Sequence, residues 1–493
     1  MAEEVTLGDV DLTTVKARTI SGIVTLISRS FLLQIVATGG FLALSIFLGR
    51  PEIGLFIAVN DLVSILGYFS DVGLAASLIQ KKDKVSLTDL RTTFTIQQIL
   101  VLLLLLFTII ISPRLINFYH ITGGGIWLLY SLLAAFFLAS LKTIPSVILE
   151  RKLQFKELAA VEVVETIVFY GVAVLLAWQG RGVISYALAV ILRGVVGTIM
   201  IYLLSPWSIG LAFSKSSLKT LLGFGLPYQI NTLLATVKDR FINILLWKVI
   251  GADGVGIIGW AQTWSQKPLR FIMDNVTRVT FPSFSRLQDH PAELKNAIEK
   301  TLFFISLATF PLLAGLVTVS PLLIKIIPKY TKWEPALLAL GLYCFNSAWA
   351  SVSTPLTSTL NALGKVKINT YLMLMWTALT WGLVPFLASR FGYNGVAYAT
   401  AIIALSSLVP IIIVKRLTHF SLLNSIAKPL ISTLIMGSVS YLLTLTLTPT
   451  LINLIINITV SGLVFFLTIY LIARNQVVTD GRKLLHAFLA KKT

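Results

Sequence analysis

The chain has 493 residues, of which 56% are hydrophobic and only 12% charged, and its mean hydropathy is +0.86. A typical soluble chain is about one quarter charged, so too few polar side chains remain here to cover a large soluble core. Disorder is excluded as well, because a disordered chain needs low hydrophobicity and dense charge. The composition predicts a polytopic membrane protein. Its net charge of +19 is therefore read loop by loop, not as a sign of nucleic acid binding.

Fourteen stretches are apolar and long enough to cross the bilayer, which takes about 20 helical residues. Each is expected to be a helix, because lipid offers unpaired backbone groups no hydrogen-bond partner. They are residues 20–48, 53–79, 89–112, 124–149, 157–179, 182–204, 219–249, 254–284, 297–326, 335–362, 367–389, 394–414, 429–447 and 450–473. Twelve crossings is the alternative, should the last two not span. The predicted fold class is an all-α polytopic membrane protein of about 14 transmembrane helices.

The distribution of Lys and Arg predicts the orientation. With the N-terminus in the cytoplasm, the inner segments hold 23 of these cations and the outer segments 8. Cytoplasmic loops of membrane proteins carry the excess of positive charge, so both termini are expected in the cytoplasm. All loops are short, which places the function within the bilayer.

Short motifs recur in the same order in the two halves of the chain. Leu48-Gly-Arg-Pro-Glu-Ile-Gly54 matches Ile250-Gly-Ala-Asp-Gly-Val-Gly256, with both glycines at the same spacing. Pro113-Arg-Leu-Ile is similar to Pro321-Leu-Leu-Ile, and Gly182-Val-Ile-Ser-Tyr-Ala to Gly395-Val-Ala-Tyr-Ala. Repeated halves of a carrier place its binding site at their interface, near the middle of the membrane, although duplication also builds inert scaffolds.

The repeat predicts two six-helix lobes followed by two further helices. The expected organisation is a cytoplasmic segment (1–19), an N-lobe (20–204), a cytoplasmic loop between lobes (205–218), a C-lobe (219–416), two C-terminal helices (424–473) and a basic cytoplasmic tail (474–493).

Charged residues inside the predicted spans are the candidate site residues, because a charge near the bilayer centre costs at least about 2.5–3.5 kcal/mol and generally faces protein or water. On the eighth span, four of them fall within about 80° of one another at 100° per residue: Lys267, Arg270, Asp274 and Arg278. The first, second, seventh and eighth spans together hold more cations than anions. The predicted substrate-binding cations are Arg29, Lys238, Arg240, Lys267, Arg270 and Arg278.

Two assignments within this set stay open. Lys238 and Arg240 point about 200° apart on a helix, so both cannot face one cavity directly. Asp61, Asp71 and Asp274 are candidates either for balancing the charge of an empty cavity or for binding a coupling cation.

A second group of intramembrane charges is better explained as structural ion pairs. Lys142 and Glu165 each lie eight residues from the inner end of their spans, at the same depth, and with Glu162 and Arg193 they form a neutral set.

Several segments resemble the bacterial polysaccharide (O-antigen, Wzx-type) flippases of the multidrug/oligosaccharidyl-lipid/polysaccharide exporter superfamily. They are Gly49-Arg-Pro-Glu-Ile-Gly54, Phe69-Ser-Asp-Val-Gly-Leu-Ala-Ala-Ser-Leu-Ile-Gln80, Gly254-Val-Gly-Ile-Ile-Gly-Trp260, Val279-Thr-Phe-Pro-Ser-Phe-Ser-Arg-Leu-Gln-Asp289 and Leu360-Asn-Ala-Leu-Gly-Lys365. The resemblance implies that two lobes in a V move an undecaprenyl-pyrophosphate-linked oligosaccharide between leaflets by alternating access, with the prenyl tail in a groove beside the two extra helices. Its other implied partners are a polysaccharide polymerase and a chain-length regulator, and a monomer is expected.

Alternative functions are weighed on the same residues. A lipid II flippase shares the architecture. A multidrug or cation antiporter of the superfamily is disfavoured, because its cationic substrates need an anionic cavity. A membrane glycosyl polymerase or ligase would need acid–base residues in a sizeable outer loop, and the outer loops offer little beyond Glu52, Asp253 and Glu334. No enzyme, metal site or cofactor is expected. With no GxxxxGK[ST] nucleotide loop in the sequence, H+ or Na+ coupling is the candidate energy source.

Overall fold

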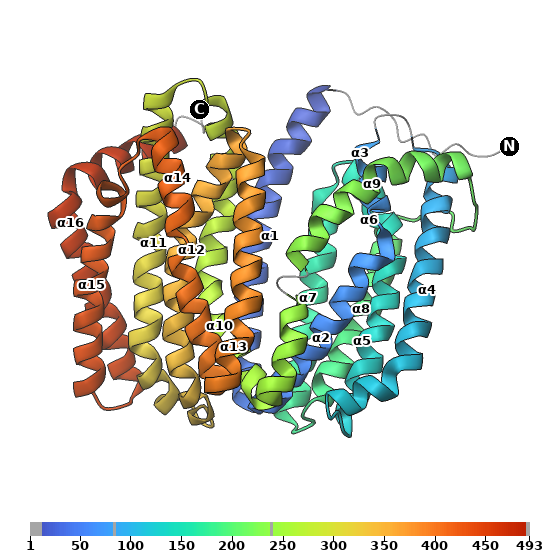
Figure 1. The fold of residues 1–493 in the computed structure, drawn as a ribbon, viewed down its shortest axis with the longest axis horizontal. Coiled ribbons are helices and arrows are strands. Elements are labelled where there is room, and N and C mark those ends of the chain that lie inside the picture. Colours follow the sequence, from blue (N-terminus) through green and yellow to red (C-terminus); the bar gives the residue numbers. More distant parts are fainter. Residues whose placement is uncertain (1–11, 82–84, 237–239, 490–493) are drawn as a thin grey trace. The chain divides into compact units, whose positions relative to one another are not determined.

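The computed structural model describes residues 12–81, 85–236 and 240–489; the side chains of 12–28, 224, 226–228, 230–236, 274–275, 278–279 and 475–489 are outside that description. All regular structure in the described residues is helical (Figure 1). The helices are α1 (Leu12–Phe47), α2 (Arg50–Asp71), α3 (Leu74–Gln80), α4 (Leu87–Phe118), α5 (Gly124–Leu141), α6 (Thr143–Arg151), α7 (Phe155–Trp178), α8 (Ile184–Leu204), α9 (Lys215–Thr236), α10 (Ile242–Arg286), α11 (Pro291–Ile326), η2 (Thr331–Ala336), α12 (Leu337–Ala362), α13 (Val366–Leu405), α14 (Leu408–Thr418), α15 (Leu422–Thr446) and α16 (Leu451–Leu489).

The predicted all-α polytopic membrane fold is confirmed. Within the described residues, 12 helical stretches are long and apolar enough to cross a membrane. One of them, Val366–Thr418, has 53 residues, more than twice the roughly 20 that one crossing takes. Its backbone leaves the helical region at Gly392 (φ 60°, ψ −141°), between the predicted spans 367–389 and 394–414. The predicted fourteen differ from the twelve at this stretch and at α9, half of whose side chains are not described.

Two spans predicted as continuous helices are broken in the structure. Residues 53–79 divide into α2 and α3, because Val72 (φ 49°) and Gly73 (φ 77°) both adopt the left-handed conformation. A side chain at Gly73 would lie 2.2 Å from the carbonyl oxygen of Gly225, so only glycine fits this break. Residues 124–149 divide into α5 and α6 at Lys142.

The described chain forms two compact units, residues 1–256 and 257–493. In the first unit, α7 packs against α1 and α8, and α8 also packs against α5. In the second, α15 and α16 pack on each other and on α11, which also contacts α12. The predicted lobes divided at residues 205–218 remain a prediction; α9 packs against α3 and α4, within the first unit.

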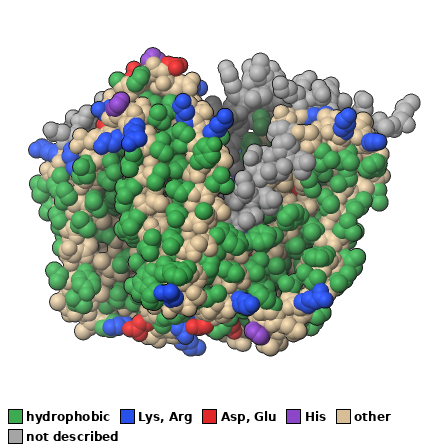
Figure 2. Space-filling model, viewed as in Figure 1, with side chains coloured by type: hydrophobic (Ala, Val, Ile, Leu, Met, Phe, Trp, Pro, Cys, Tyr) green, Lys and Arg blue, Asp and Glu red, His purple; other side chains and the backbone are tan. Residues whose placement is uncertain are grey.

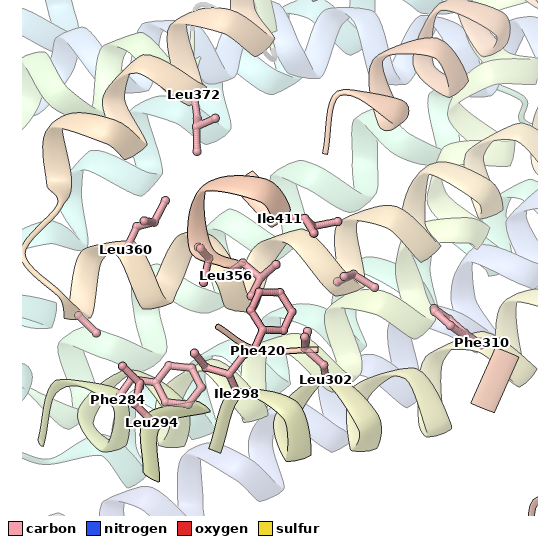
Figure 3. Close-up of a cluster of buried hydrophobic side chains, with 13 residues drawn as sticks. Phe284, Leu294, Ile298, Leu302, Phe310, Leu356, Leu360, Leu372, Ile411 and Phe420 are labelled. Carbon is pink, nitrogen blue, oxygen red and sulfur yellow. The ribbon is translucent and has the colours of Figure 1, made fainter. Parts of the chain in front are cut away.

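Each unit has its own apolar interior. In the second unit, Phe284, Leu302, Leu356 and Phe420 are at most 1% exposed and belong to one cluster that joins α10, α11, α12 and the segment after α14 (Figure 3). Apolar side chains also cover the outside: on the face in Figure 2, hydrophobic groups dominate the middle of the helices, while Lys and Arg gather near their ends. This pattern is typical of a surface that contacts lipid.

The two matching glycine motifs lie against each other in the first unit. A Cβ atom at Gly54 would fall 2.0 Å from the carbonyl oxygen of Ala252, and one at Gly256 would fall 2.0 Å from that of Arg50. Arg50 Nε also forms an ion pair with Asp253 Oδ1 at 2.9 Å. Each motif therefore supplies the glycine that lets the other motif's backbone approach.

Candidate functional site

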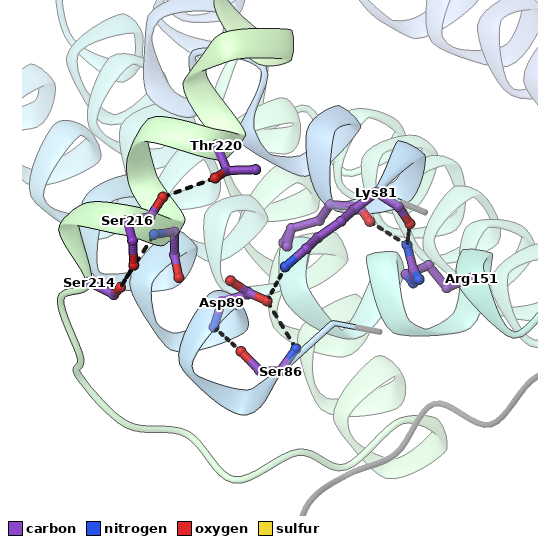
Figure 4. Close-up of polar contacts among 9 residues, drawn as sticks. Lys81, Ser86, Asp89, Arg151, Ser214, Ser216 and Thr220 are labelled. Carbon is purple, nitrogen blue, oxygen red and sulfur yellow. Dashed lines mark hydrogen bonds and ion pairs between the residues drawn. The ribbon is translucent and has the colours of Figure 1, made fainter. Parts of the chain in front are cut away.

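A polar network lies at the end of α3 and the start of α4 (Figure 4). Ser86 and Asp89 form a capping box, in which each backbone N–H donates to the other residue's side chain, at 3.0 and 3.1 Å. Lys81 Nζ lies 2.6 Å from Asp89 Oδ2. Arg151 donates to the carbonyl oxygens of Leu78 and Lys81 at 2.7 and 2.8 Å. Lys81 and Arg151 thus bind the ends of neighbouring helices in the first unit.

Four charges predicted as structural lie on α7, on α8 and at the α5–α6 junction. Lys142 forms an ion pair with Glu165, whose side chain is 5% exposed. Arg193 Nε lies 3.5 Å from the other carboxylate oxygen of Glu165. Glu162 does not join them but pairs with Arg29 of α1. Glu165 therefore balances two cations, and its carboxylate links three helices.

Arg29 has a carboxylate partner in the structure, which the sequence analysis did not expect of this predicted substrate-binding cation. Its guanidinium pairs with Glu162, whose side chain is 45% exposed. The depth of Glu162 in its span predicts a group with Lys142 and Arg193 instead. The helix packing gives the reason for the difference, since α1 packs along α7 and so brings Arg29 to Glu162.

Asp61 is the centre of a second polar group in the first unit. It is 4% exposed. Arg240 donates to one of its carboxylate oxygens, and Asn243 donates to the other at 2.5 Å. Arg240 is thus neutralised in this structure, while 40% of its side chain stays exposed. Asn243 was not among the predicted site residues; its spacing of three from Arg240 on the same helix face was the available signal.

The remaining predicted site residues fall into three groups. On α10, Lys267 lies over the Trp264 ring at 5.7 Å, and Arg270 is exposed and makes no ion pair with any side chain that the structure describes. Asp71 accepts hydrogen bonds from the backbone N–H of Ala75 at 3.1 and 3.3 Å, at the start of α3. Lys238 and the side chains of Asp274 and Arg278 lie outside the described residues.

An apolar groove runs between α11, α12 and α15 in the second unit. Its volume is about 510 Å³, and its walls include Leu313, Val317, Phe345 and Leu434. Small residues make room for it: Gly341 and Gly437 line it, and a Cβ on either would meet no atom closer than 3.9 Å. The groove lies beside one of the two extra helices, where the resemblance led us to expect a site for a prenyl tail.

These features belong to a known class of membrane protein. The family described as "Polysaccharide biosynthesis protein" matches residues 43–337. The chain belongs to this family, as the resemblance of its motifs in both halves of the chain indicated.

Named relatives agree with this family, and solved structures share the fold. The teichuronic acid biosynthesis protein TuaB of Bacillus subtilis is 25% identical over 382 residues, covering 75% of this chain and 77% of the relative. The lipopolysaccharide biosynthesis protein WzxC of Escherichia coli is 22% identical over 320 residues, covering 64% of each. The fold is similar to the inward-closed lipid II flippase MurJ (TM-score 0.75, 16% identity, 92% of this chain and 99% of that one). It is also similar to an inward-facing multidrug MATE transporter (TM-score 0.58, 17% identity, 80% and 99%).

Proposed function

We propose that this chain is a flippase that moves an undecaprenyl-pyrophosphate-linked oligosaccharide across the bacterial inner membrane by alternating access. The family and its relatives, named for teichuronic acid and lipopolysaccharide biosynthesis, support a polysaccharide precursor as cargo. The proposed orientation has both termini in the cytoplasm, following the excess of Lys and Arg on that side.

The observation that carries the proposal is the row of cations on α10. Lys267 and Arg270 lie within a stretch, Ile242–Met273, that is apolar enough to span the membrane. Such a charge is costly in hydrocarbon unless it faces water, protein or an anion. Arg offers a planar fork that binds two phosphate oxygens at once, and Lys adds a mobile point charge. A pyrophosphate is the anion of a lipid-linked sugar that fits this pair.

In this proposal Arg29 and Arg240 also bind the pyrophosphate, but only after it displaces the carboxylates that now pair with them. Each pairs with a carboxylate in the structure, and each pair leaves a quarter or more of the Arg side chain exposed. An entering pyrophosphate would compete with Glu162 or Asp61 for them. Release of Asp61 would then leave a carboxylate able to take up H+, which is a route for coupling.

The groove beside α15 is the proposed path of the prenyl tail. Lipid is as apolar as the groove, so a tail gains only packing contacts on entering it. The groove would therefore align the tail and discriminate between lipids more than it would add affinity. The sugars would cross in water on the cationic side.

The test is complementation of a strain that lacks its own flippase for a surface polysaccharide. Lys267→Ala/Arg270→Ala is expected to lower surface polysaccharide at least tenfold, at an unchanged amount of protein in the membrane. Lys365→Ala, an exposed cation between α12 and α13, is the control and should export normally. Normal export by the double variant would show that the α10 cations are not on the transport path. If the wild-type protein exported neither polysaccharide nor any lipid-linked sugar, the proposed class of cargo would be wrong.

A further inference from the structure

A pocket of about 630 Å³ lies at the end of the first unit where α1 leads into α2 and α4 leads into α5. The turn between α7 and α8, and the bend of α10 at Gly251, complete its walls. All its lining residues precede residue 257, so it belongs to one unit. It shares no lining residue with the groove beside α15 and does not include Lys267 or Arg270. It opens at the helix ends that the cation distribution assigns to the outside.

The pocket carries basic side chains that lack partners. Arg181, Lys248 and His120 line it and are exposed. None of the three side chains makes a hydrogen bond or ion pair with another residue in the described parts of the chain. The one carboxylate in its lining, Glu52, is engaged by the backbone N–H of Gly49 at 2.5 Å. Two permanent cations therefore face this space with one anion that is already hydrogen-bonded.

The inner wall is aromatic and holds an unused polar group. The rings of Tyr119 and Trp247 lie 5.3 Å apart and are 1% and 5% exposed. The hydroxyl of Tyr119 is buried and has no hydrogen-bond partner among the residues that the structure describes, an arrangement that is unfavourable unless a ligand supplies the partner. Burial raises the pKa of Tyr119 to about 12, so the group is a neutral phenol that can donate a hydrogen bond at physiological pH.

Small loop residues keep the pocket open. Gly182 adopts φ +55°, and a Cβ there would meet the carboxylate of Glu52 at 2.6 Å. Gly124 and Gly125, at the start of α5, also line it. Backbone and a carboxylate thus remain within reach of a ligand that has many hydroxyl groups.

We propose that this pocket binds a saccharide unit that carries a carboxylate, on the face of the protein opposite the N-terminal end of α1. Aromatic rings pack on the apolar faces of sugars, the phenol of Tyr119 and the carboxylate of Glu52 suit sugar hydroxyls, and Arg181 and Lys248 suit the acidic group. Glu52 would repel a bare phosphate at the same place. The site goes beyond the proposed function, since it would hold the sugars after crossing or select among them, and its existence does not depend on flipping.

Binding to the full chain in lipid nanodiscs tests the proposal without any transport step. The probes are a trisaccharide with one glucuronate residue, its neutral glucose counterpart and inorganic phosphate, each followed by saturation-transfer NMR. The acidic trisaccharide is expected to bind, and Arg181→Ala/Lys248→Ala to weaken it at least tenfold. Tyr119→Phe should weaken it several-fold while Trp247 stays in place.

Arg114→Ala is the matched control: Arg114 is an exposed cation near the same end of α4 that does not line the pocket, and its loss should leave binding unchanged. Equal weakening by Arg114→Ala, equal binding of the neutral trisaccharide, or no binding of the acidic one would each overturn the proposal. Binding of phosphate alone, at the affinity of the acidic sugar, would do so too by showing a plain anion site.

Discussion

Gly54 of α2 and Gly256 of α10 touch through their backbones: a Cβ on Gly54 would lie 2.7 Å from the amide nitrogen of Gly256. The two residues end the matching motifs of the two chain halves. The contact makes the motifs reciprocal partners in one helix crossing, and it explains why the sequence keeps glycine at the same spacing twice.

Gly54→Ala or Gly256→Ala is expected to destabilise the protein by about 1–3 kcal/mol, because each new methyl group overlaps a backbone atom that cannot rotate away. Thermal unfolding of the purified protein measures this. Gly67→Ala on the same helix is the control, since a Cβ there would meet no neighbouring atom of the described residues within 4 Å, and it should leave stability unchanged or raise it slightly. Equal stability of all three variants would contradict the close crossing.

The Asp61–Arg240 pair separates a structural role from a binding role. Asp61→Ala leaves Arg240 and Asn243 without their acceptor and should cost about 1–3 kcal/mol, less than for a fully buried pair because Arg240 is partly exposed. Asp61→Asn/Arg240→Gln keeps neutral hydrogen-bonding groups and should fold with near-normal stability. Its export should still fall about tenfold, measured per molecule in the membrane. Normal export by this double variant would assign the pair to structure alone.

Glu165 is expected to act only on stability. Replacing it by alanine removes the carboxylate that pairs with Lys142 in a buried place. The free energy of unfolding should fall by about 3 kcal/mol, and the amount of folded protein should fall with it. Lys142→Leu/Glu165→Leu should recover much of that loss, since an apolar pair can replace a buried ion pair. Export divided by protein amount should be unchanged in both. A fall in this ratio at normal protein amount would place Glu165 on the transport path.

Filling the groove beside α15 tests the path of the prenyl tail. Gly437→Phe projects a ring into the groove and should slow export about three- to tenfold without loss of protein, a modest effect because lipid solvates a displaced tail equally well. Gly462→Phe on α16 is the control, as its surroundings are open and it does not line the groove. Identical export by the two variants would show that the tail does not use this groove.

Much of the fold can be predicted from the sequence, because the length of an apolar stretch and the charge of a loop depend only on residues that are neighbours in the chain. The spans, the break near Gly392 and the reciprocal motifs around Gly54 and Gly256 were all visible in the chain. The breaks at Val72–Gly73 and Lys142 were not, since both lie within apolar stretches and depend on what packs against them. The site was harder still. Depth along the helix predicts that Glu162 groups with Lys142. In the structure α1 packs on α7, and Glu162 forms its ion pair with Arg29 instead.

Contacts between helices also determine which of the predicted cations form ion pairs with carboxylates. Helical spacing showed that Lys267 and Arg270 share a face, yet it could not show that Asp61 meets Arg240, 179 residues away. The pocket around Tyr119 and Arg181 was missed for the same reason, because four separate turns contribute to it.

The central claim is that basic side chains on α10 carry a pyrophosphate-linked sugar through the membrane. Its most direct test is flipping of a fluorescent undecaprenyl-pyrophosphate-linked oligosaccharide by the purified full chain in proteoliposomes, followed by access of a quencher. We expect flipping by the wild type and at least tenfold slower flipping by Lys267→Ala/Arg270→Ala, with Lys365→Ala unaffected. Flipping at the wild-type rate by the double variant would contradict the claim.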